Sequence, residues 1–252
     1  MAHPAVAVLE RHLYLYRRLW KASVFSFFIL PFLFLVSIGL GVGGYVGDID
    51  GVSYLGWIAP GVLASTAFQI AVNESTYGVL SDFEWVGGLH TMRTTRVSVK
   101  DMVAGWLMYV LFVLTIAVLA FLVVTLLFGA VHSPWAVLAP LVCCLVAVSA
   151  AAPTTAFSAS IRNDGYFELL TRFGVIPATL FAGVFFPVGD LPDGFRQLAY
   201  ASPLWHGVEL SRASFLGTAP AWPPLAHAGY LLLWAAAGWI WAARAFRRRL
   251  GN

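Results

Sequence analysis

The chain has 252 residues, of which 60% are hydrophobic and only 11% are charged, and its mean hydropathy is +0.81. Soluble domains usually carry about 25% charged residues, so this composition excludes an ordinary soluble protein and predicts an integral membrane protein. The net charge of +3 does not indicate nucleic-acid binding, because the basic residues fall in separate groups between apolar runs.

Long apolar runs predict a single all-α domain, residues 1–252, with six transmembrane helices. Each crossing needs roughly 20 mostly apolar residues. In chain order, the predicted spans cover residues 22–43, 54–77, 102–128, 135–159, 167–186 and 225–243. The residues before the first span lack the apolar core and cleavage site of a signal peptide, so this span is expected to serve as the insertion signal.

Lysine and arginine residues alternate with these spans. All but two of the 15 basic residues fall before span one, between spans two and three, between span four and the first residues of span five, or after span six. The two exceptions are Arg196 and Arg212. Cytoplasmic loops carry an excess of Lys and Arg, so the sequence predicts that both termini lie in the cytoplasm.

Residues 4–21 predict an interfacial helix on the membrane surface. Apolar residues recur there at spacings of three and four, and the basic residues occupy other positions, as is typical of a helix lying among lipid headgroups. The apolar positions are Val6, Leu9, Leu13, Tyr16 and Trp20. Two roles remain open, an anchor alone or an anchor that also contacts a cytoplasmic partner.

The loop between spans two and three, residues 79–100, is too polar to span and too long for a simple turn. Asp82 stands where a helix N-cap is expected, with acids early and bases late, which predicts a short helix along the cytoplasmic face. The side chains expected to be exposed on it are Phe83, Trp85, Leu89 and Met92. Exposed aromatic and methionine side chains favour a protein docking site, and the alternative is a helix sunk in headgroups.

Glu74 is a carboxylate near the cytoplasmic end of span two, at a depth where such a group needs a partner, water or a function. A structural contact is the expected role. The alternative, a proton relay, would make the protein a proton-coupled secondary transporter. Gln69 and Asn73 are expected to form hydrogen bonds between helices.

Residues that carry catalysis or bind metals are not apparent in the sequence. Cys143 and Cys144 are adjacent in an apolar run, which is typical of small buried side chains. No nucleotide-binding motif stands in its required context, so the chain is expected to bind no ATP, cofactor or metal and not to be an enzyme by itself. A membrane-embedded lipid-modifying enzyme would need a paired nucleophile and base, and a non-transporting scaffold is a further alternative.

A half-polar stretch, FFPVGDLPDGFRQLAYASPLWHGVELSR, interrupts the chain at residues 185–212, before the last span. Two other segments accompany it, SYLGWIAPGVLA at residues 53–64 and the FEW…M helix before span three. Together they resemble the membrane subunit of bacterial ABC-2 type exporters, in the branch of the nodulation-factor exporter permease and the daunorubicin-resistance permeases. The resemblance covers nearly the whole chain, and it rests on the order of the segments because none of them is catalytic.

The resemblance implies a coupling helix after span two that docks on an ATPase, with Glu84 pairing with a basic residue of that subunit. The implied docking residues are Phe83, Glu84, Trp85, Leu89, Met92 and Arg93. Residues 187–217 would form an external re-entrant helical hairpin that narrows the outer mouth, the alternative being a folded loop without a gating role. The implied gate residues are Phe186, Pro187, Leu191, Pro192, Pro203 and Arg212. A substrate path is expected near spans one, two and five, at Phe27, Phe28, Phe32, Phe181 and Phe185.

The function implied by the resemblance is that of a permease subunit of an ATP-driven exporter. It would move a hydrophobic or amphipathic substrate, such as a drug, lipid, glycolipid or polysaccharide, out of the cytoplasm. Two permease subunits, the same or related, would pair among the lipids of a bacterial inner membrane. Two copies of a separate ATPase would bind the ATP and Mg. The substrate and the choice between homodimer and heterodimer remain open.

Overall fold

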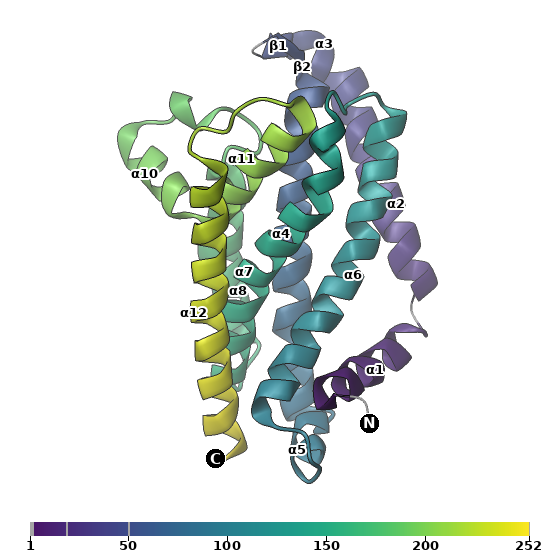
Figure 1. The fold of residues 1–252 in the computed structure, drawn as a ribbon, viewed down its shortest axis with the longest axis vertical. Coiled ribbons are helices and arrows are strands. Elements are labelled where there is room, and N and C mark those ends of the chain that lie inside the picture. Colours follow the sequence, from purple (N-terminus) through teal and green to yellow (C-terminus); the bar gives the residue numbers. More distant parts are fainter. Residues whose placement is uncertain (1–2, 19, 50, 252) are drawn as a thin grey trace.

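The computed structural model describes residues 3–18, 20–49 and 51–251, which form a bundle of helices along one long axis (Figure 1). Most of these residues are helical. The strands in these ranges are β1 (Asp48–Ile49) and β2 (Val52–Ser53), which pair as a short antiparallel hairpin at the end of the bundle opposite the two termini. The fold is therefore that of a mostly helical membrane protein.

The described helices follow one another with short connections. They are α1 (Pro4–Tyr16), α2 (Trp20–Val36), α3 (Gly43–Val46), α4 (Tyr54–Glu84), α5 (Gly88–Arg93), α6 (Val99–Leu127), α7 (Ala139–Ser160), α8 (Gly165–Leu170), α9 (Ile176–Phe181), α10 (Asp193–Ala201), α11 (Pro203–Leu216) and α12 (Pro224–Leu250). Two π-helical segments join α2 to α3 and α8 to α9, and two short 3-10 helices precede α7 and α10. These are η1 (Ser37–Val42), η3 (Thr171–Val175), η2 (Pro134–Leu138) and η4 (Val188–Asp190).

Among the described residues, four helical segments are long and apolar enough to cross a membrane: α4, α6, α12 and the segment Pro134–Ser160, which contains η2 and α7. They correspond to predicted spans two, three, six and four. α2 holds a shorter apolar stretch, Phe27–Val36, and its helix continues through η1 and α3. The count of six spans stays a prediction beyond these four.

Predicted span five ends earlier than expected. α8, η3 and α9 form one helical run that stops at Phe181, so the predicted end at residue 186 is wrong. Gly183 has a φ of +75°, in the left-handed region that turns a chain out of a helix. The Arg212 guanidinium donates a hydrogen bond of 2.7 Å to the Gly183 carbonyl, which holds the turn in place.

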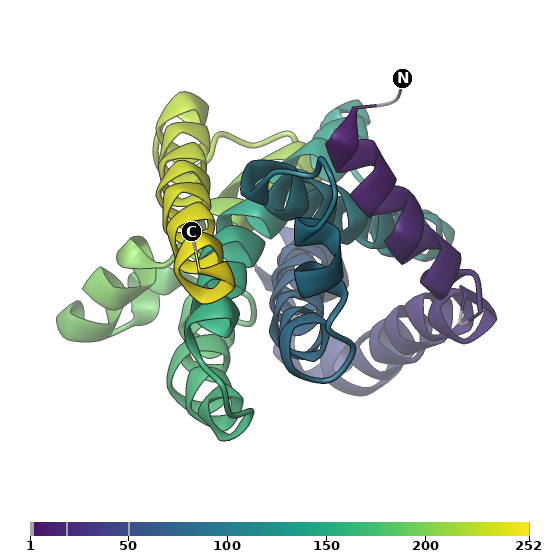
Figure 2. The same cartoon turned by 90° about the horizontal axis from the view of Figure 1, so that it is seen from below.

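α4 lies at the centre of the bundle, with α7 packed along one side of it and α12 packed against α7 (Figures 1 and 2). Their close approach follows from small residues. The buried Ser158 hydroxyl of α7 donates to the Ser75 carbonyl of α4 at 2.7 Å. On the other side of α7, Gly238 of α12 lies directly against Pro153. In the membrane, small residues of this kind let helix backbones approach closely.

Gly238→Ala should lower the stability of the α7–α12 pair. A Cβ at this position would lie 2.5 Å from both Cδ and N of Pro153, so the two helices would have to separate. We expect a cost of about 1–3 kcal/mol, the usual range for overpacking. Gly229→Ala on the same helix is the matched control, because its Cβ would meet nothing within 4 Å.

The measurement for this pair is thermal unfolding of the purified chain in detergent. Alanine is favoured over glycine inside a helix by up to about 1 kcal/mol, so Gly229→Ala should leave the unfolding temperature unchanged or raise it. Equal behaviour of the two variants would contradict the close packing of α12 on α7.

α1 lies across the termini end of α6 (Figures 1 and 2). Its buried residues are Ala5, Val8 and His12, whereas the predicted apolar face of this helix is half-buried or exposed. A Cβ added at Gly105 of α6 would lie 2.5 Å from Cβ of Val8, so the two backbones are in close contact. α1 is therefore packed onto the bundle through a face that the spacing of large apolar residues did not indicate.

Candidate functional site

The last turn of α4 is joined to α1 by an ion pair. Two nitrogens of the Arg11 guanidinium donate to the two carboxylate oxygens of Asp82, each at 2.7 Å. The Asp82 side chain is buried and Arg11 is partly exposed. A bidentate pair of this kind combines a strong charge-assisted hydrogen bond with a fixed geometry. The predicted role of Asp82 as a helix N-cap is wrong, because α4 continues through it to Glu84.

His12 completes the contact between α1 and the rest of the bundle. Its ring packs edge-on against Trp106, with centroids 4.6 Å apart, and its Nε2 lies 3.8 Å from Asp82. Burial lowers the pKa of His12 to about 4, although the nearby Asp82 carboxylate opposes this shift. The imidazole is therefore neutral at physiological pH, and Arg11 is the cation that balances Asp82.

Two residues further along α4, Glu84 forms an ion pair with Arg249 of α12. The same guanidinium stacks over the Phe83 ring, 4.3 Å from its centroid. It also donates to the carbonyls at the end of α7, at 3.0 Å to Ser158 and 2.5 Å to Ile161. Arg249 thus joins the ends of three helices, and the acid predicted to pair with an ATPase has a partner within its own chain.

The predicted docking residues divide into buried and exposed sets. Phe83 and Leu89 are only 4% and 2% exposed, so the prediction that they are exposed is wrong. Trp85 is 64% exposed at the tip beyond α4. Met92 is half-buried, and Arg93 donates to the Gly251 carbonyl at 3.3 Å. Phe83 and Leu89 hold α5 against the bundle. Glu84, Trp85 and Arg93 are exposed, and Trp85 is the exposed aromatic residue of the set.

A cleft of about 810 Å³ lies between α1 and the segment that joins α5 to α6. Its mostly apolar wall includes Val8, Met92 and Val97, with Arg11 and Arg96 among the charged residues. The cleft is lined by α1 and α5, and Trp85 lies between α4 and α5, so both are at the end of the bundle that holds the two termini (Figure 1). This end offers a recess and a protruding aromatic ring, the features that protein interfaces use as hot spots.

A second cavity, of about 420 Å³, lies within the bundle between α2, α4, α6 and α9. Two of the predicted path residues, Phe27 and Phe185, line it. Its polar strip comes from α4, where Ser65, Gln69 and Asn73 recur at intervals of four. A mostly apolar cavity with a few polar groups is the usual character of a ligand site.

The other predicted path residues lie elsewhere. Phe28 stacks on Phe32, with ring centroids 6.5 Å apart, and Phe32 contacts Phe128. Phe181 stacks on Phe195 of α10 at 5.0 Å. For α2, helix periodicity explains this result, because Phe27 and Phe28 are adjacent and point in different directions, and Phe27 is the one of the two that lines the cavity.

The polar strip on α4 was missed as part of the site. The amide of Gln69 donates to the Ser65 hydroxyl at 3.1 Å, one turn back on the same helix. Among the described residues, no hydrogen bond joins Gln69 to another helix, although one was predicted. The signal was in the sequence, as polar residues recurring every four positions along an apolar span. Glu74 is not among the residues that line this cavity, and its structural role stays a prediction.

The segment after α9 contains a largely buried arginine. Arg212 of α11 forms an ion pair with Glu209 at 3.2 Å, and its guanidinium stacks 3.9 Å from the centroid of the Trp57 ring on α4. Besides its bond to Gly183, its Nε lies 3.5 Å from the Trp57 carbonyl. Gly61 makes room for this arrangement, since a Cβ there would lie 3.1 Å from the Val184 carbonyl. Arg212 therefore ties α4, α11 and the turn after α9 into one unit.

The remaining predicted gate residues lie before and within the two short helices α10 and α11. Phe186, Pro187 and Leu191 are half-buried, Pro192 is exposed before α10, and Pro203 begins α11. α11 is joined to α12, where the buried rings of His206 and His227 bring their Nδ1 atoms within 2.9 Å. Two consecutive helices are thus present at these residues, and their arrangement as a re-entrant hairpin stays a prediction.

Comparison with known proteins links this architecture to a family. The family model for the ABC-2 type transporter matches residues 5–216. The chain is 26% identical to Nodulation protein J of Rhizobium leguminosarum bv. viciae over 245 residues, covering 97% of this chain and 94% of that protein. It is 27% identical to Nodulation protein J of Rhizobium meliloti over 255 residues, covering 97% and 93%.

A relative outside the nodulation proteins matches as well. The Inner membrane transport permease YadH of Escherichia coli is 26% identical over 216 residues, which cover 84% of this chain and 82% of that protein. The resemblance to ABC-2 permeases is therefore confirmed, and with it a bacterial membrane protein whose family works with an ABC ATPase subunit. Because the family model matches most of the chain, and because the chain has helices long and apolar enough to cross a membrane, it belongs to the ABC-2 type transporter family, as the membrane subunit of an ABC transporter.

Proposed function

We propose that this chain is the permease subunit of an ATP-driven exporter, in which α4 links an ATPase docking end to a substrate cavity. The observation that carries the proposal is the path of α4. It lines the cavity from Val62 to Asn73 and reaches the docking end at Trp85. With a rise of 1.5 Å per residue, the distance along the helix from Asn73 to Asp82 is about 14 Å.

The two ion pairs at the end of α4 would carry movement from the ATPase into the bundle. Asp82 is bound to α1 and Glu84 to α12, so a displacement of the segment around Trp85 acts on both helices. ATP binding by the partner would move this segment and change the opening of the cavity. A ligand drives such a change only if it binds the two states differently, which here would be the role of ATP and Mg on the ATPase.

The cavity supports a hydrophobic or amphipathic cargo. Phenylalanine side chains from α2 and α6 face the α4 strip of hydroxyl and amide groups across it, so apolar chains and hydrogen-bonding groups both find partners. Two such subunits, the same or related, would place two cavities in the bacterial inner membrane. With the basic ends in the cytoplasm, the external hairpin would narrow the outer mouth.

Trp85→Ala should weaken binding of the ABC ATPase that co-purifies with the chain. Truncation of a central aromatic residue at an interface typically costs about 2 kcal/mol, or roughly 30-fold in affinity. The measurement is the dissociation constant of the two purified subunits in nanodiscs, together with ATP hydrolysis by the complex. Trp135→Ala is the control, since Trp135 is 62% exposed near the opposite end of the bundle.

Unchanged ATPase affinity of Trp85→Ala would move the docking surface away from the end of α4. A loss in both variants would indicate damage to the fold, which thermal unfolding of each variant would reveal. The proposal requires that the loss be confined to Trp85→Ala.

Thr66→Trp should block transport without affecting ATPase docking. Thr66 lines the cavity on α4, and an indole placed there would project into the cavity of about 420 Å³ and obstruct it. We expect transport of an amphipathic fluorescent substrate into inverted vesicles to fall at least tenfold, by loss of a complementary binding site. Leu33→Trp on the exposed surface of α2 is the control. Full transport by Thr66→Trp would place the substrate path elsewhere.

A further inference from the structure

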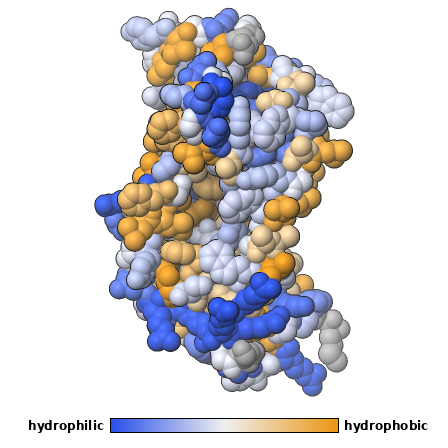
Figure 3. All heavy atoms as spheres, turned by 90° about the vertical axis from the view of Figure 1, so that its left-hand side faces the viewer, coloured by the Kyte–Doolittle hydropathy of each residue, from blue (hydrophilic) through white to orange (hydrophobic). Residues whose placement is uncertain are grey.

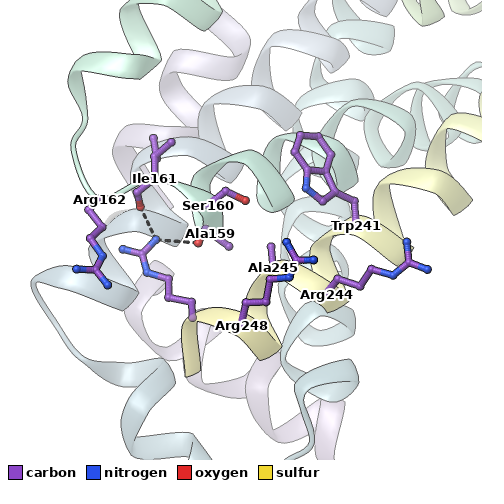
Figure 4. A pocket seen from close by; sticks show the side chains of 9 residues that line it. Ala159, Ser160, Ile161, Arg162, Trp241, Arg244, Ala245 and Arg248 are labelled. Atoms are coloured by element: carbon purple, nitrogen blue, oxygen red, sulfur yellow. Dashed lines mark hydrogen bonds between the residues drawn. The ribbon is translucent and has the colours of Figure 1, made fainter. Parts of the chain in front are cut away.

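A cavity of about 470 Å³ opens at the termini end of the bundle, between the end of α7 and the last turns of α12. Figure 4 shows Arg162 on the segment that follows α7, Arg244 and Arg248 on α12, and Trp241 above them. Arg249 also lines this cavity. In Figure 4 the side chains of Arg162 and Arg244 lie on opposite sides of the cavity, with Arg248 between them, so the lining as a whole is strongly positive.

Only one of these arginines is neutralised within the described part of the chain. Arg249 is bound to Glu84 and to carbonyls of α7. No ion pair joins Arg162, Arg244 or Arg248 to an acidic side chain among the described residues. Like charges brought together repel one another, so this arrangement favours an anion that enters the cavity. Planar guanidinium groups match the oxygens of a phosphate in particular.

A second, mostly apolar cavity of about 310 Å³ lies next to the arginine cavity, toward the middle of the bundle. Trp241 lines both cavities, so the two are neighbours at its ring. The upper one is enclosed by Pro153 and Phe157 of α7, Ala178 of α9 and Trp234 of α12. On this side of the molecule, hydrophilic surface gathers at the lower end, and hydrophobic and intermediate residues lie above it (Figure 3).

We propose that the two cavities together bind one anionic glycerophospholipid, with its phosphate among Arg162, Arg244 and Arg248 and an acyl chain along the apolar cavity. The order of the two parts along the bundle matches that of a lipid molecule, with the charged group at the membrane surface and the chain within the hydrocarbon. Arginine residues near an anionic membrane surface attract its lipids, and basic pockets between transmembrane helices bind such headgroups. The apolar cavity is what distinguishes a lipid from free phosphate.

This lipid is distinct from the transported cargo. The proposed substrate cavity lies between α2, α4 and α6, whereas the lipid site lies between α7, α9 and α12. A bound phosphate would brace the chain after α7 against α12, beside Arg249 and its pair with Glu84. The assignment to the inner leaflet rests on the proposed orientation, with the termini in the cytoplasm.

The test compares lipid retention by the purified full-length chain. After exchange into detergent containing equal amounts of phosphatidylglycerol and phosphatidylcholine, native mass spectrometry counts the lipids bound to the protein. We expect at least a tenfold preference for phosphatidylglycerol in the unaltered chain. The triple variant R162Q/R244Q/R248Q should retain the two lipids within twofold of each other.

The control removes the same number of charges from the same end of the molecule. Arg17, Arg18 and Arg96 are all exposed, and R17Q/R18Q/R96Q should keep the preference. An equal loss in both triple variants would show a general charge effect and overturn the proposal. Weaker ATPase binding by R162Q/R244Q/R248Q with unchanged lipid preference would also overturn it, because the arginines would then belong to the partner's surface.

A second variant tests the apolar part of the site. Ala178→Phe should fill the upper cavity and reduce phosphatidylglycerol retention at least fivefold, with the arginines untouched. Glycerol 3-phosphate at millimolar concentration supplies the phosphate without an acyl chain. Complete displacement of the lipid by glycerol 3-phosphate, with as large a rise in the unfolding temperature as phosphatidylglycerol gives, would show that the site binds a free anion. In that case the lipid assignment would fail.

Discussion

Arg11→Met should be among the most destabilising single substitutions in this chain. It leaves the buried Asp82 carboxylate without its cation and removes the link between α1 and α4. Breaking one side of a buried ion pair typically costs about 3–5 kcal/mol. Arg11 is partly exposed to solvent, so we expect a loss near the lower limit, about 3 kcal/mol. Neutral His12 offers no replacement charge.

Thermal unfolding and limited proteolysis of the purified chain would measure this effect, with cleavage after α1 as the specific sign. Arg17→Met is the control, because Arg17 is exposed beyond the end of α1. Arg11→Lys should recover only part of the loss, since an ammonium group cannot reproduce the bidentate geometry. Resistance of Arg11→Met to proteolysis at the level of the unaltered chain would show that packing against α6 alone holds α1.

Arg212→Gln should have a comparable effect at the other end of the bundle. The substitution leaves Glu209 without its ion pair, frees the Gly183 carbonyl and removes the stacking on Trp57. Because these groups are largely buried, we expect about 3–5 kcal/mol of destabilisation and disorder in the turn after α9. Transport should fall with it, while ATPase docking at the distant end should persist.

Arg196→Gln is the matched control for Arg212. Arg196 also donates to carbonyls of the external segment, at 3.0 Å to Gly189 and 2.9 Å to Leu191. Its ion pair with Asp193 is exposed, however, and exposed pairs contribute about 0–1 kcal/mol. The unfolding temperatures and transport rates of the two variants, measured side by side, test whether Arg212 stabilises the fold more than Arg196 does. Similar small losses in both variants would show that Arg212 contributes no more than an ordinary loop contact.

Much of the fold could be predicted because a long apolar run is by itself enough to indicate a membrane helix. The apolar runs identified α4, α6, α7 and α12, and most of the predicted helix ends lie within a few residues of the observed ones. The end of α9 could not be predicted, because the turn at Gly183 depends on a hydrogen bond from Arg212, 29 positions away. Apolar composition continued past that turn to Phe186 and concealed it.

The candidate site was less accessible to sequence reasoning. Glu84 looked like a free surface acid, yet its partner, Arg249, is 165 residues away in the chain. Phe83 looked like an exposed aromatic residue, yet α12 covers it. In both cases the residue type alone suggested an exposed side chain. Which side chains remain exposed depends on the packing of helices that are distant in the sequence, and the local pattern does not contain that information.

The unbroken length of α4 makes it a single rod that is held near both ends. Near one end Gly61 packs against Val184 and Arg212, and at the other end Asp82 and Glu84 bind α1 and α12. From Gly61 to Glu84 the helix rises by 23 residue steps, about 35 Å at 1.5 Å per residue. Tilting such a rod by about 5° displaces its end by about 3 Å. A mutation that loosens the contact at Gly61 should therefore weaken the transmission of movement between the proposed docking end and the proposed outer mouth.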